Sequence, residues 1–231
     1  IKLSDTIDYL GSDFICKTKT GKFKCSVCSP GIFSVYNALA VIAISIYLGI
    51  DRDIILDTLK NVKVNGRVEV LPILDNVSVI LDYAHNSISL ENILSTLKDY
   101  NPNRLICLIG SIGKRAKLRR RELGDIAAKN CDICFLTSDN PDSEDPMNII
   151  NEMAESFRGS NCKVIKEPDR ERAINIAIEI AKEGDIVLLA GKGHEEYQLI
   201  NGKRVYFSDR ETAIKAAKRL KDNSKFNKHI V

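Results

Sequence analysis

No apolar run in this chain of 231 residues reaches the roughly 18 residues that are needed to span a bilayer. The start of the chain lacks the basic-then-apolar pattern of a secretory signal. The formal net charge of +3 is small for this length and gives no reason to expect a nucleic-acid partner. From these absences we expect a cytoplasmic protein that binds neither membrane nor nucleic acid.

A disulfide framework is equally unsupported, because the seven cysteines are an odd number and are scattered along the chain. The pairs Cys25-Ser-Val-Cys28 and Cys131-Asp-Ile-Cys134 offer the alternative of a four-thiolate zinc site. The second pair lies at the start of an expected strand, where successive side chains face opposite sides. We therefore expect the cysteines to be small buried hydrophobic residues and predict no metal site.

The usual signatures of hydrolases and of ATP-binding loops are also missing. The chain contains no Gly-x-Ser-x-Gly elbow, no His-Glu-x-x-His helix and no phosphate-binding P-loop. His85 and His194 are candidates for a catalytic base or a metal ligand, as in a cytosolic hydrolase, but no third ligand stands at close spacing. A structural or hydrogen-bonding role for each histidine is an equally good interpretation.

What the chain does contain, after residue 66, is an alternation of apolar and helical patterns. Apolar runs typical of buried strands lie at 77–81, 105–109, 133–137 and 186–190, with a weaker run at 163–165. Helical periods alternate with them at 87–100, 119–130, 145–157 and 169–182. With 44% hydrophobic residues, the chain can bury a core. We predict an α/β fold with a Rossmann-like, mostly parallel sheet that carries helices on both faces.

The first 66 residues do not show this alternation of strand and helix patterns. We expect a hairpin at 14–28 and helices at 34–48 and 51–60. This is too little to form an obvious domain alone, so it looks like the tail of something larger that ends at Asn65-Gly66-Arg67. We predict a partial segment at 1–66 and a separate Rossmann-like domain at 67–231.

Polar clusters follow the expected strands at four places. They are Asp82-Tyr83-Ala84-His85, Gly110 to Arg121, Ser138-Asp139-Asn140-Pro141-Asp142, and Ala190-Gly191-Lys192-Gly193-His194-Glu195-Glu196. Ligands of parallel sheets bind beyond the carboxyl ends of the strands. We therefore expect the four clusters to form one site.

Individual residues of these clusters suggest ligands, each with a plainer alternative. Asp82 is placed to accept hydrogen bonds from ribose hydroxyls, or to cap the following helix, where Asn86 or Ser87 competes for that role. Six cations between Lys114 and Arg121 favour an anion contact or form a solvated helix face. The two glycines of the last cluster let backbone amides approach a carboxylate or phosphate.

Taken in order, these motifs resemble the carboxyl-terminal part of the Mur ligases, and most closely the UDP-N-acetylmuramoyl tripeptide synthetases. The similar runs are Gly66-Arg67-Val68-Glu69, Asp82 to His85, Ser138 to Pro141 with Glu144-Asp145-Pro146, Ala190 to Gln198, and Ser208-Asp209-Arg210-Glu211. Residues 29–49 also resemble a helix near the end of the family's central domain, to which residues 1–66 would then belong. The resemblance covers nearly the whole chain.

The resemblance implies an ATP-dependent amide ligase of peptidoglycan synthesis. In that family, ATP phosphorylates the free carboxylate of UDP-N-acetylmuramoyl-L-alanyl-D-glutamate, and the amine of a diamino acid attacks the acyl phosphate. By resemblance, the nucleotide contacts are Arg67, Asp82, His85 and Arg119. The contacts to the incoming amino acid are Arg115, Asp139, Asn140, Asp142, Gly191 and Glu195. No catalytic residue of this chain follows from the resemblance.

Two departures from the family matter. The phosphate-binding loop and the central-domain lysine that holds magnesium are absent, so we expect the ATP and Mg sites in a missing upstream part and no activity from this chain alone. Asp142 stands where relatives that add diaminopimelate commonly have arginine. A carboxylate there repels the distal carboxylate of diaminopimelate and attracts an ammonium, which favours lysine.

Three alternatives stay open. The loop from Gly110 to Arg121 also departs from the family's Gly-Gly-Asp-Arg-Asp pattern, so that Lys114 or Arg115 offers a substitute cation for diaminopimelate. A non-catalytic binding or regulatory module derived from a Mur ligase is a second class of function. Related ligases that extend polyglutamate, folate or cyanophycin chains are a third.

Overall fold

The computed structural model describes residues 2–3, 11–19, 21–114 and 117–228, and for 2–3 and 224–228 it describes the backbone alone. The chain divides into two compact units, Ile1–Glu69 and Val70–Val231, which are described separately. None of the helices in the described ranges combines the length and the apolar character that a membrane span requires.

The first unit is a small sheet with two helices. Its antiparallel strands are β1 (Lys2–Leu3), β2 (Ser12–Thr18) and β3 (Gly21–Val27), and its helices are α1 (Ile32–Tyr47) and α2 (Arg52–Asn61). Alternate residues of β2, such as Phe14 and Cys16, are buried in an apolar cluster with Val35 and Ile42 of α1. The predicted hairpin and both predicted helices are present, within a few residues of the expected bounds.

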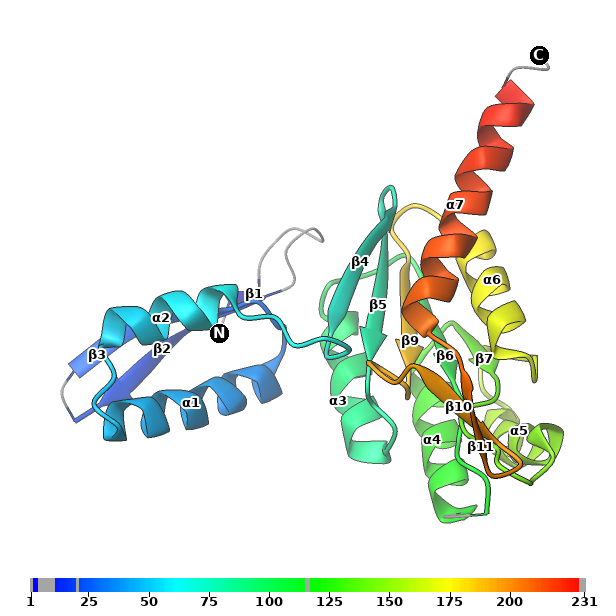
Figure 1. The fold of residues 1–231 in the computed structure, drawn as a ribbon, viewed down its shortest axis with the longest axis horizontal. Coiled ribbons are helices and arrows are strands. Elements are labelled where there is room, and N and C mark those ends of the chain that lie inside the picture. Colours follow the sequence, from blue (N-terminus) through cyan, green and yellow to red (C-terminus); the bar gives the residue numbers. More distant parts are fainter. Residues whose placement is uncertain (1, 4–10, 20, 115–116, 229–231) are drawn as a thin grey trace. The chain divides into compact units, whose positions relative to one another are not determined.

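The second unit is built on a six-stranded sheet in the order β4-β5-β9-β6-β7-β8 (Figure 1). The strands are β4 (Glu69–Leu74), β5 (Val77–Asp82), β6 (Leu105–Ile109), β7 (Ile133–Leu136), β8 (Lys163–Lys166) and β9 (Ile186–Ala190). The five strands from β5 to β9 pair in parallel. These are the five strands that the apolar runs predict, whereas the edge strand β4 was not predicted.

Helices cover both faces of this sheet, as predicted. They are α3 (Ser87–Lys98), α4 (Lys117–Asn130), α5 (Pro146–Ala154) with the 3-10 turn η1 (Glu155–Phe157), α6 (Arg170–Ile180) and α7 (Asp209–Lys228). Figure 1 shows α6 and α7 side by side, where they bury Ala173 and Ala213 against one face of the sheet together with strand residues such as Leu81. Ile80, which precedes Leu81 in β5, is also fully buried, and it faces the opposite side of the sheet. Helices α3 and α4 cover that side with residues such as Leu94.

A separate two-stranded hairpin, β10 (Tyr197–Ile200) and β11 (Lys203–Tyr206), precedes α7. The sequence interpretation missed it, although Asn201-Gly202 between the two strands is a strong hairpin signal. Both turn residues have positive φ, 49° and 75°, as a two-residue turn of this kind requires. The hairpin packs on the loop that follows β7.

Candidate functional site

The loops after β5, β9, β6 and β7 meet at the carboxyl edge of the sheet, because these parallel strands are neighbours. Backbone hydrogen bonds join them in pairs. The Gly191 amide donates to the Asp82 carbonyl at 3.1 Å, and the Gly113 amide donates to the Asn140 carbonyl at 2.9 Å. The structure thus brings together the four clusters that the sequence singled out.

Lys192 occupies the middle of this edge with no exposed surface. Its Nζ lies 3.1 Å from Glu195 Oε2, 3.3 Å from Asn140 Oδ1 and 3.5 Å from Asp139 Oδ1. The ring of Tyr197 lies beneath it, with its centroid 5.3 Å away. A buried ammonium is stable only when it is paired and hydrogen-bonded, and these groups supply both needs. The sequence interpretation did not single out Lys192.

Three of the predicted amino-acid contacts therefore belong to one polar network. Asn140 Nδ2 donates to Glu195 Oε2 at 3.4 Å, and Asn140 Oδ1 accepts from the Leu199 amide at 3.0 Å. Asp139 is buried, and this burial raises the pKa of its carboxyl, while Lys192 and Arg170 act in the opposite direction. Gly191 adopts φ 105°, a conformation that favours glycine and turns the chain out of β9.

Tyr83 connects this network to the histidines. Its hydroxyl donates to Glu195 Oε1 at 3.3 Å, and its ring lies between those of His85 and His194, with centroids 4.6 and 5.3 Å away. Burial and the Glu195 carboxylate raise the pKa of Tyr83, so its hydroxyl keeps its proton at neutral pH. His85 Nδ1 is 2.8 Å from the Tyr83 carbonyl oxygen, which gives this histidine a hydrogen-bonding role. Among the described residues, no group of three or more His, Cys, Asp or Glu could hold a metal ion.

Asp82 ends β5 and is mostly buried. Its Oδ1 accepts from the Ala84 amide at 2.8 Å and closes a local turn. The cap of α3 is Asn86, whose Oδ1 accepts from the Ser89 amide at 2.9 Å. The capping alternative for Asp82 is therefore wrong, while its contact to a ribose stays a prediction.

Gly110 and Gly113 are explained by close packing of loops. A Cβ atom on Gly113 would lie 1.9 Å from the Pro141 carbonyl oxygen, and one on Gly110 would lie 2.4 Å from the Thr137 carbonyl oxygen. Neither contact is sterically possible, because the obstructing atoms are backbone. These glycines allow the loop after β6 to lie directly on the loop after β7.

The run of cations after Gly113 is largely neutralised by carboxylates. Arg120 is buried and binds both oxygens of Glu144 at 2.7 Å, with Glu152 Oε2 at 3.0 Å. This pairing, with a hydrogen bond from the Lys114 amide, lowers the pKa of Glu144 to about 2. Arg120 is thus a structural residue rather than a member of an exposed basic patch.

The remaining predicted basic contacts lie in different surroundings. Arg119 is half-buried on α4, and Arg67 is exposed in the first unit. Arg115 lies outside the described residues. The solvated-face interpretation holds for Lys117 and Arg121, whose side chains are 81% and 80% exposed.

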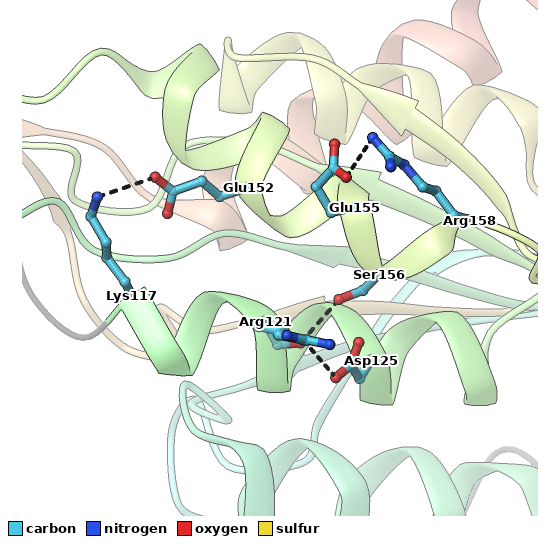
Figure 2. A pocket seen from close by; sticks show the side chains of 7 residues that line it. All are labelled: Lys117, Arg121, Asp125, Glu152, Glu155, Ser156 and Arg158. Carbon is cyan, nitrogen blue, oxygen red and sulfur yellow. Dashed lines mark hydrogen bonds and ion pairs between the residues drawn. The ribbon is translucent and has the colours of Figure 1, made fainter.

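Those two exposed cations line a surface hollow of about 600 Å³ between α4 and the α5–η1 segment (Figure 2). Its charged side chains pair with one another: Lys117 with Glu152 at 3.7 Å, Arg121 with Asp125 at 3.9 Å, and Arg158 with Glu155. The hollow is lined by three cations and three carboxylates, so its charge is balanced.

Asp142 is hydrogen-bonded to the β10–β11 hairpin through both its backbone and its side chain. Its amide donates to the Leu199 carbonyl and its carbonyl accepts from the Asn201 amide, both at 2.8 Å. Its Oδ1 accepts from the Gly202 amide at 2.8 Å, and its Oδ2 lies 3.7 Å from Lys114 Nζ. The residue also lines a hollow of about 650 Å³ between the β7 loop, the start of α6 and the hairpin. The negative charge inferred from the sequence is therefore partly compensated.

A third buried cation, Arg170, joins the elements behind this edge of the sheet. It pairs with Asp209 at the start of α7, and it donates to the Ser138 carbonyl at 3.2 Å and to the Ala190 carbonyl at 3.0 Å. These two carbonyls immediately precede Asp139 and Gly191. Arg170 was missed because a cation at the start of a helix gives no sign of burial in the sequence.

All seven cysteines are free thiols. Six are buried, as predicted, and Cys28 is half-buried with its thiol donating to the Val62 carbonyl. Burial raises the pKa of Cys162 to about 12. The Cys162 thiol is thus protonated at neutral pH.

Comparison with known proteins gives a consistent result. Residues 66–193 match the family described as Mur ligase, glutamate ligase domain. The chain is 40% identical over 201 residues to a UDP-N-acetylmuramoyl-L-alanyl-D-glutamate--2,6-diaminopimelate ligase of Caldanaerobacter subterraneus subsp. tengcongensis, covering 87% of this chain and 42% of the relative. A protein of the same name from Aquifex aeolicus is 41% identical, with 87% and 42% covered.

Solved structures show the same similarity in three dimensions. A structure of a ligase with the same name superposes with a TM-score of 0.66 and 33% identity, over 90% of this chain and 43% of that one. A MurF ligase from Thermotoga maritima, in complex with ADP, shares the fold with a TM-score of 0.62 at 19% identity, over 92% of this chain and 44% of that one. The chain spans about two fifths of the length of the curated relatives that it matches.

Proposed function

The chain belongs to the Mur ligase family, and on that premise we propose that it is the carboxyl-terminal part of an ATP-dependent ligase. The ligase adds a diamino acid to UDP-N-acetylmuramoyl-L-alanyl-D-glutamate. Residues 1–66 are the tail of the central domain, and residues 67–231 are the C-terminal domain. The division of the structure after Glu69 supports a boundary close to this one.

The observation that carries the proposal is the network of Asp139, Asn140, Lys192 and Glu195 at the carboxyl edge of the sheet. In this network the carboxylates of Asp139 and Glu195 share one buried ammonium, that of Lys192. The edge therefore suits a ligand that brings a further positive charge. The ammonium groups of a diamino acid have that charge. Asp139, Asn140, Asp142, Gly191 and Glu195, with Arg115, are the proposed contacts of the amino acid.

Nucleotide contacts are proposed at Arg67, Asp82, His85 and Arg119. Asp82 stands at the end of β5, where a carboxylate is placed to accept from ribose hydroxyls. Arg67 belongs to the first unit and the other three to the second. The triphosphate and Mg are assigned to the upstream part, since this sequence contains no P-loop.

In the reaction, ATP supplies the phosphoryl group that turns the unreactive substrate carboxylate into an acyl phosphate. The amine then forms the C–N bond, the C–O bond to phosphate breaks, phosphate leaves, and the nitrogen loses a proton. The part of the ligase formed by this chain positions the substrates: it holds the amine in attack geometry beside the activated carbonyl. Positioning of this kind supplies a large share of the rate of such reactions.

For the amino acid itself, diaminopimelate is the first candidate. Relatives at about 40% identity are named for it, and Lys114, 3.7 Å from Asp142, offers a cation for its distal carboxylate. Lysine is the second candidate, favoured by the carboxylate of Asp142, which attracts an ammonium and repels a carboxylate.

The test is an assay of the full-length ligase with ATP, the UDP-linked dipeptide and each diamino acid, followed by mass spectrometry of the product. We expect a tripeptide product and release of phosphate. The 231-residue chain alone should give neither, since it has no phosphate loop. A full-length protein without a P-loop, or one that makes no tripeptide, would support the non-catalytic module instead.

A further inference from the structure

We propose that Lys192 is a positioning residue for the incoming amino acid: its ammonium sets the orientation of Asp139, Asn140 and Glu195 from beneath the site. The proposal rests on the proposed function, because those three residues are assigned to the amino acid there. Lys192 itself has no exposed surface, so it acts through its neighbours and not by touching the substrate.

The geometry fixes each neighbour separately. The ammonium donates to Asn140 Oδ1 at 3.3 Å and to Glu195 Oε2 at 3.1 Å, and it lies 3.5 Å from Asp139 Oδ1. That Asp139 oxygen is buried and has no hydrogen-bond partner among the described residues, so the ion pair with Lys192 is the contact that compensates it. Without the ammonium, the Asp139 and Glu195 carboxylates would lose the cation that contacts both, and Arg170 would be left to act on Asp139 alone.

The orientation of the Asn140 amide follows from the same contact. Its Oδ1 receives two donors, Lys192 Nζ and the Leu199 amide at 3.0 Å, and its Nδ2 is thereby turned to Glu195. An asparagine amide can be flipped by 180° at little cost unless its neighbours dictate the direction. Here a cation and a backbone N–H both dictate it.

The loop that carries Lys192 is anchored at both ends. The Gly191 amide donates to the Asp82 carbonyl at 3.1 Å, and the Glu195 amide donates to the Lys192 carbonyl at 2.9 Å. Gly193, with φ 52°, completes the tight turn between them. The side chain of Lys192 therefore points back under the loop from a fixed backbone.

The kinetic test is Lys192→Met in the full-length ligase, which keeps the length of the side chain and removes the charge. We expect KM for the diamino acid to rise by about tenfold or more, the loss for one hydrogen bond to a charged group. KM for ATP should stay within about twofold of the original value, since the proposed nucleotide contacts are made by other residues. Lys98→Met, at the opposite edge of the sheet, is the matched control and should change neither constant.

A double-mutant cycle with Glu195→Gln separates positioning from a general loss of stability. If Lys192 acts through Glu195, the second substitution has a smaller effect on KM when Lys192 is already methionine. Additive effects, or equal rises in KM for ATP and for the amino acid, would overturn the proposal.

Two NMR measurements need no activity, and the first of them uses the unsubstituted 231-residue chain. The Lys192 ammonium protons should exchange slowly with water in a nitrogen-correlated NMR spectrum, unlike those of Lys98. The second is a carbon-detected titration of Lys192→Met, in which the pKa of Asp139 should rise further. The other charged and titratable groups that face Asp139 are unchanged in this variant; they are Arg170, Glu195, Asp209 and Tyr83.

Fast exchange of the Lys192 protons, or an unchanged Asp139 titration, would refute the role of Lys192. Absence of tripeptide from the unsubstituted full-length enzyme would instead refute the proposed function. The two failures are distinguishable because the first is read by NMR on the chain and the second by product mass.

Discussion

Arg170 and Asp209 form an ion pair in which neither side chain has any exposed surface. Two contacts join them, Nε to Oδ1 at 2.7 Å and Nη2 to Oδ2 at 2.6 Å. The same guanidinium donates to the carbonyls of Ser138, just after β7, and Ala190, at the end of β9, two strands that are separated in the sheet by β6. One side chain therefore ties β7, β9, α6 and α7 together directly behind the candidate site.

Replacing this cation should unfold the edge of the sheet. We expect Arg170→Leu to lower the free energy of unfolding by about 3 to 5 kcal/mol, because Asp209 is left as an uncompensated buried charge. Urea unfolding measures the change. The matched control is Arg172→Leu on the same helix, where a 72% exposed side chain pairs with Glu167. Its loss should cost no more than about 1 kcal/mol, and equal effects of the two substitutions would contradict the prediction.

The contact of Gly113 with Pro141 leads to a second prediction. In Gly113→Ala, the new Cβ meets a backbone oxygen at 1.9 Å, so one loop must move away from the other. We expect a loss of about 1 to 3 kcal/mol, typical of overpacking, and a lower melting temperature by calorimetry. Ser111→Ala in the same loop is the control. It removes a buried hydroxyl that has no partner among the described residues, so it should leave stability nearly unchanged.

The parallel sheet could be predicted from the sequence because continuous apolar runs, such as 105–109 and 186–190, report burial on both faces directly. The position of the site followed from the same pattern, since strand ends are fixed once the strands are known. What failed was the interpretation of polar residues. Arg120 looks like a solvated cation in the sequence, and its burial is explained by Glu144, which is 24 residues away. Lys192 was not singled out, and its burial depends on Asp139 and Asn140 of another loop as well as on the nearby Glu195.

The role of Gly110 and Gly113 was unpredictable for a similar reason. They are needed where two loops touch, and that contact joins segments about thirty residues apart. The hairpin at 197–206 was missed although it could have been predicted, because its Asn-Gly turn is a local signal. The contact between the two loops has no comparable local signal.

Glu144 gives the protein a distinct acid sensitivity. Its pKa is about 2 in the folded state against an ordinary value of 4.5, mainly because Arg120 binds it. A lowered pKa contributes stability that is complete above the unfolded value and is lost as the pH falls toward 2. After allowance for solvent screening of the partly exposed carboxylate, the loss is about 1 to 2 kcal/mol.

Denaturant unfolding at a series of acidic pH values measures this contribution. We expect Glu144→Gln to be less stable at neutral pH and to lose less stability on acidification. Glu155→Gln, which removes a surface partner of Arg158, is the control and should keep the original pH dependence. A parallel fall for Glu144→Gln and the unsubstituted chain would show that this pair does not govern acid stability.

Asp82→Ala separates a nucleotide contact from a structural role. In the full-length ligase we expect KM for ATP to rise about ten- to hundredfold, the loss of a hydrogen bond to a charged group. Stability should fall by only about 1 kcal/mol, because one turn bond to the Ala84 amide is lost. Asn86→Ala, which removes the cap of α3, should cost a similar stability with KM for ATP unchanged. An unaltered KM in Asp82→Ala would remove Asp82 from the nucleotide site.

Asp142 decides between the two candidate amino acids if its carboxylate faces the side chain of the substrate. Asp142→Arg places a cation at that point, so the ratio of kcat/KM for diaminopimelate to that for lysine should rise by more than about tenfold. Competition between the two amino acids, scored by the mass of the tripeptide, measures the ratio. This expectation holds whichever amino acid the unsubstituted enzyme prefers, because only the change in charge is compared.

Asp142→Asn is the control that keeps the hairpin in place. Its side-chain oxygen can still accept from the Gly202 amide, as Asp142 Oδ1 does at 2.8 Å, but the charge opposite Lys114 is gone. We expect this variant to shift the ratio in the same direction and by less than the arginine variant, because it removes repulsion without adding attraction. If the asparagine variant leaves the ratio unchanged and the arginine variant only lowers stability, Asp142 is an anchor of the β10–β11 hairpin. Lys114 is then the better candidate for contact with the distal carboxylate.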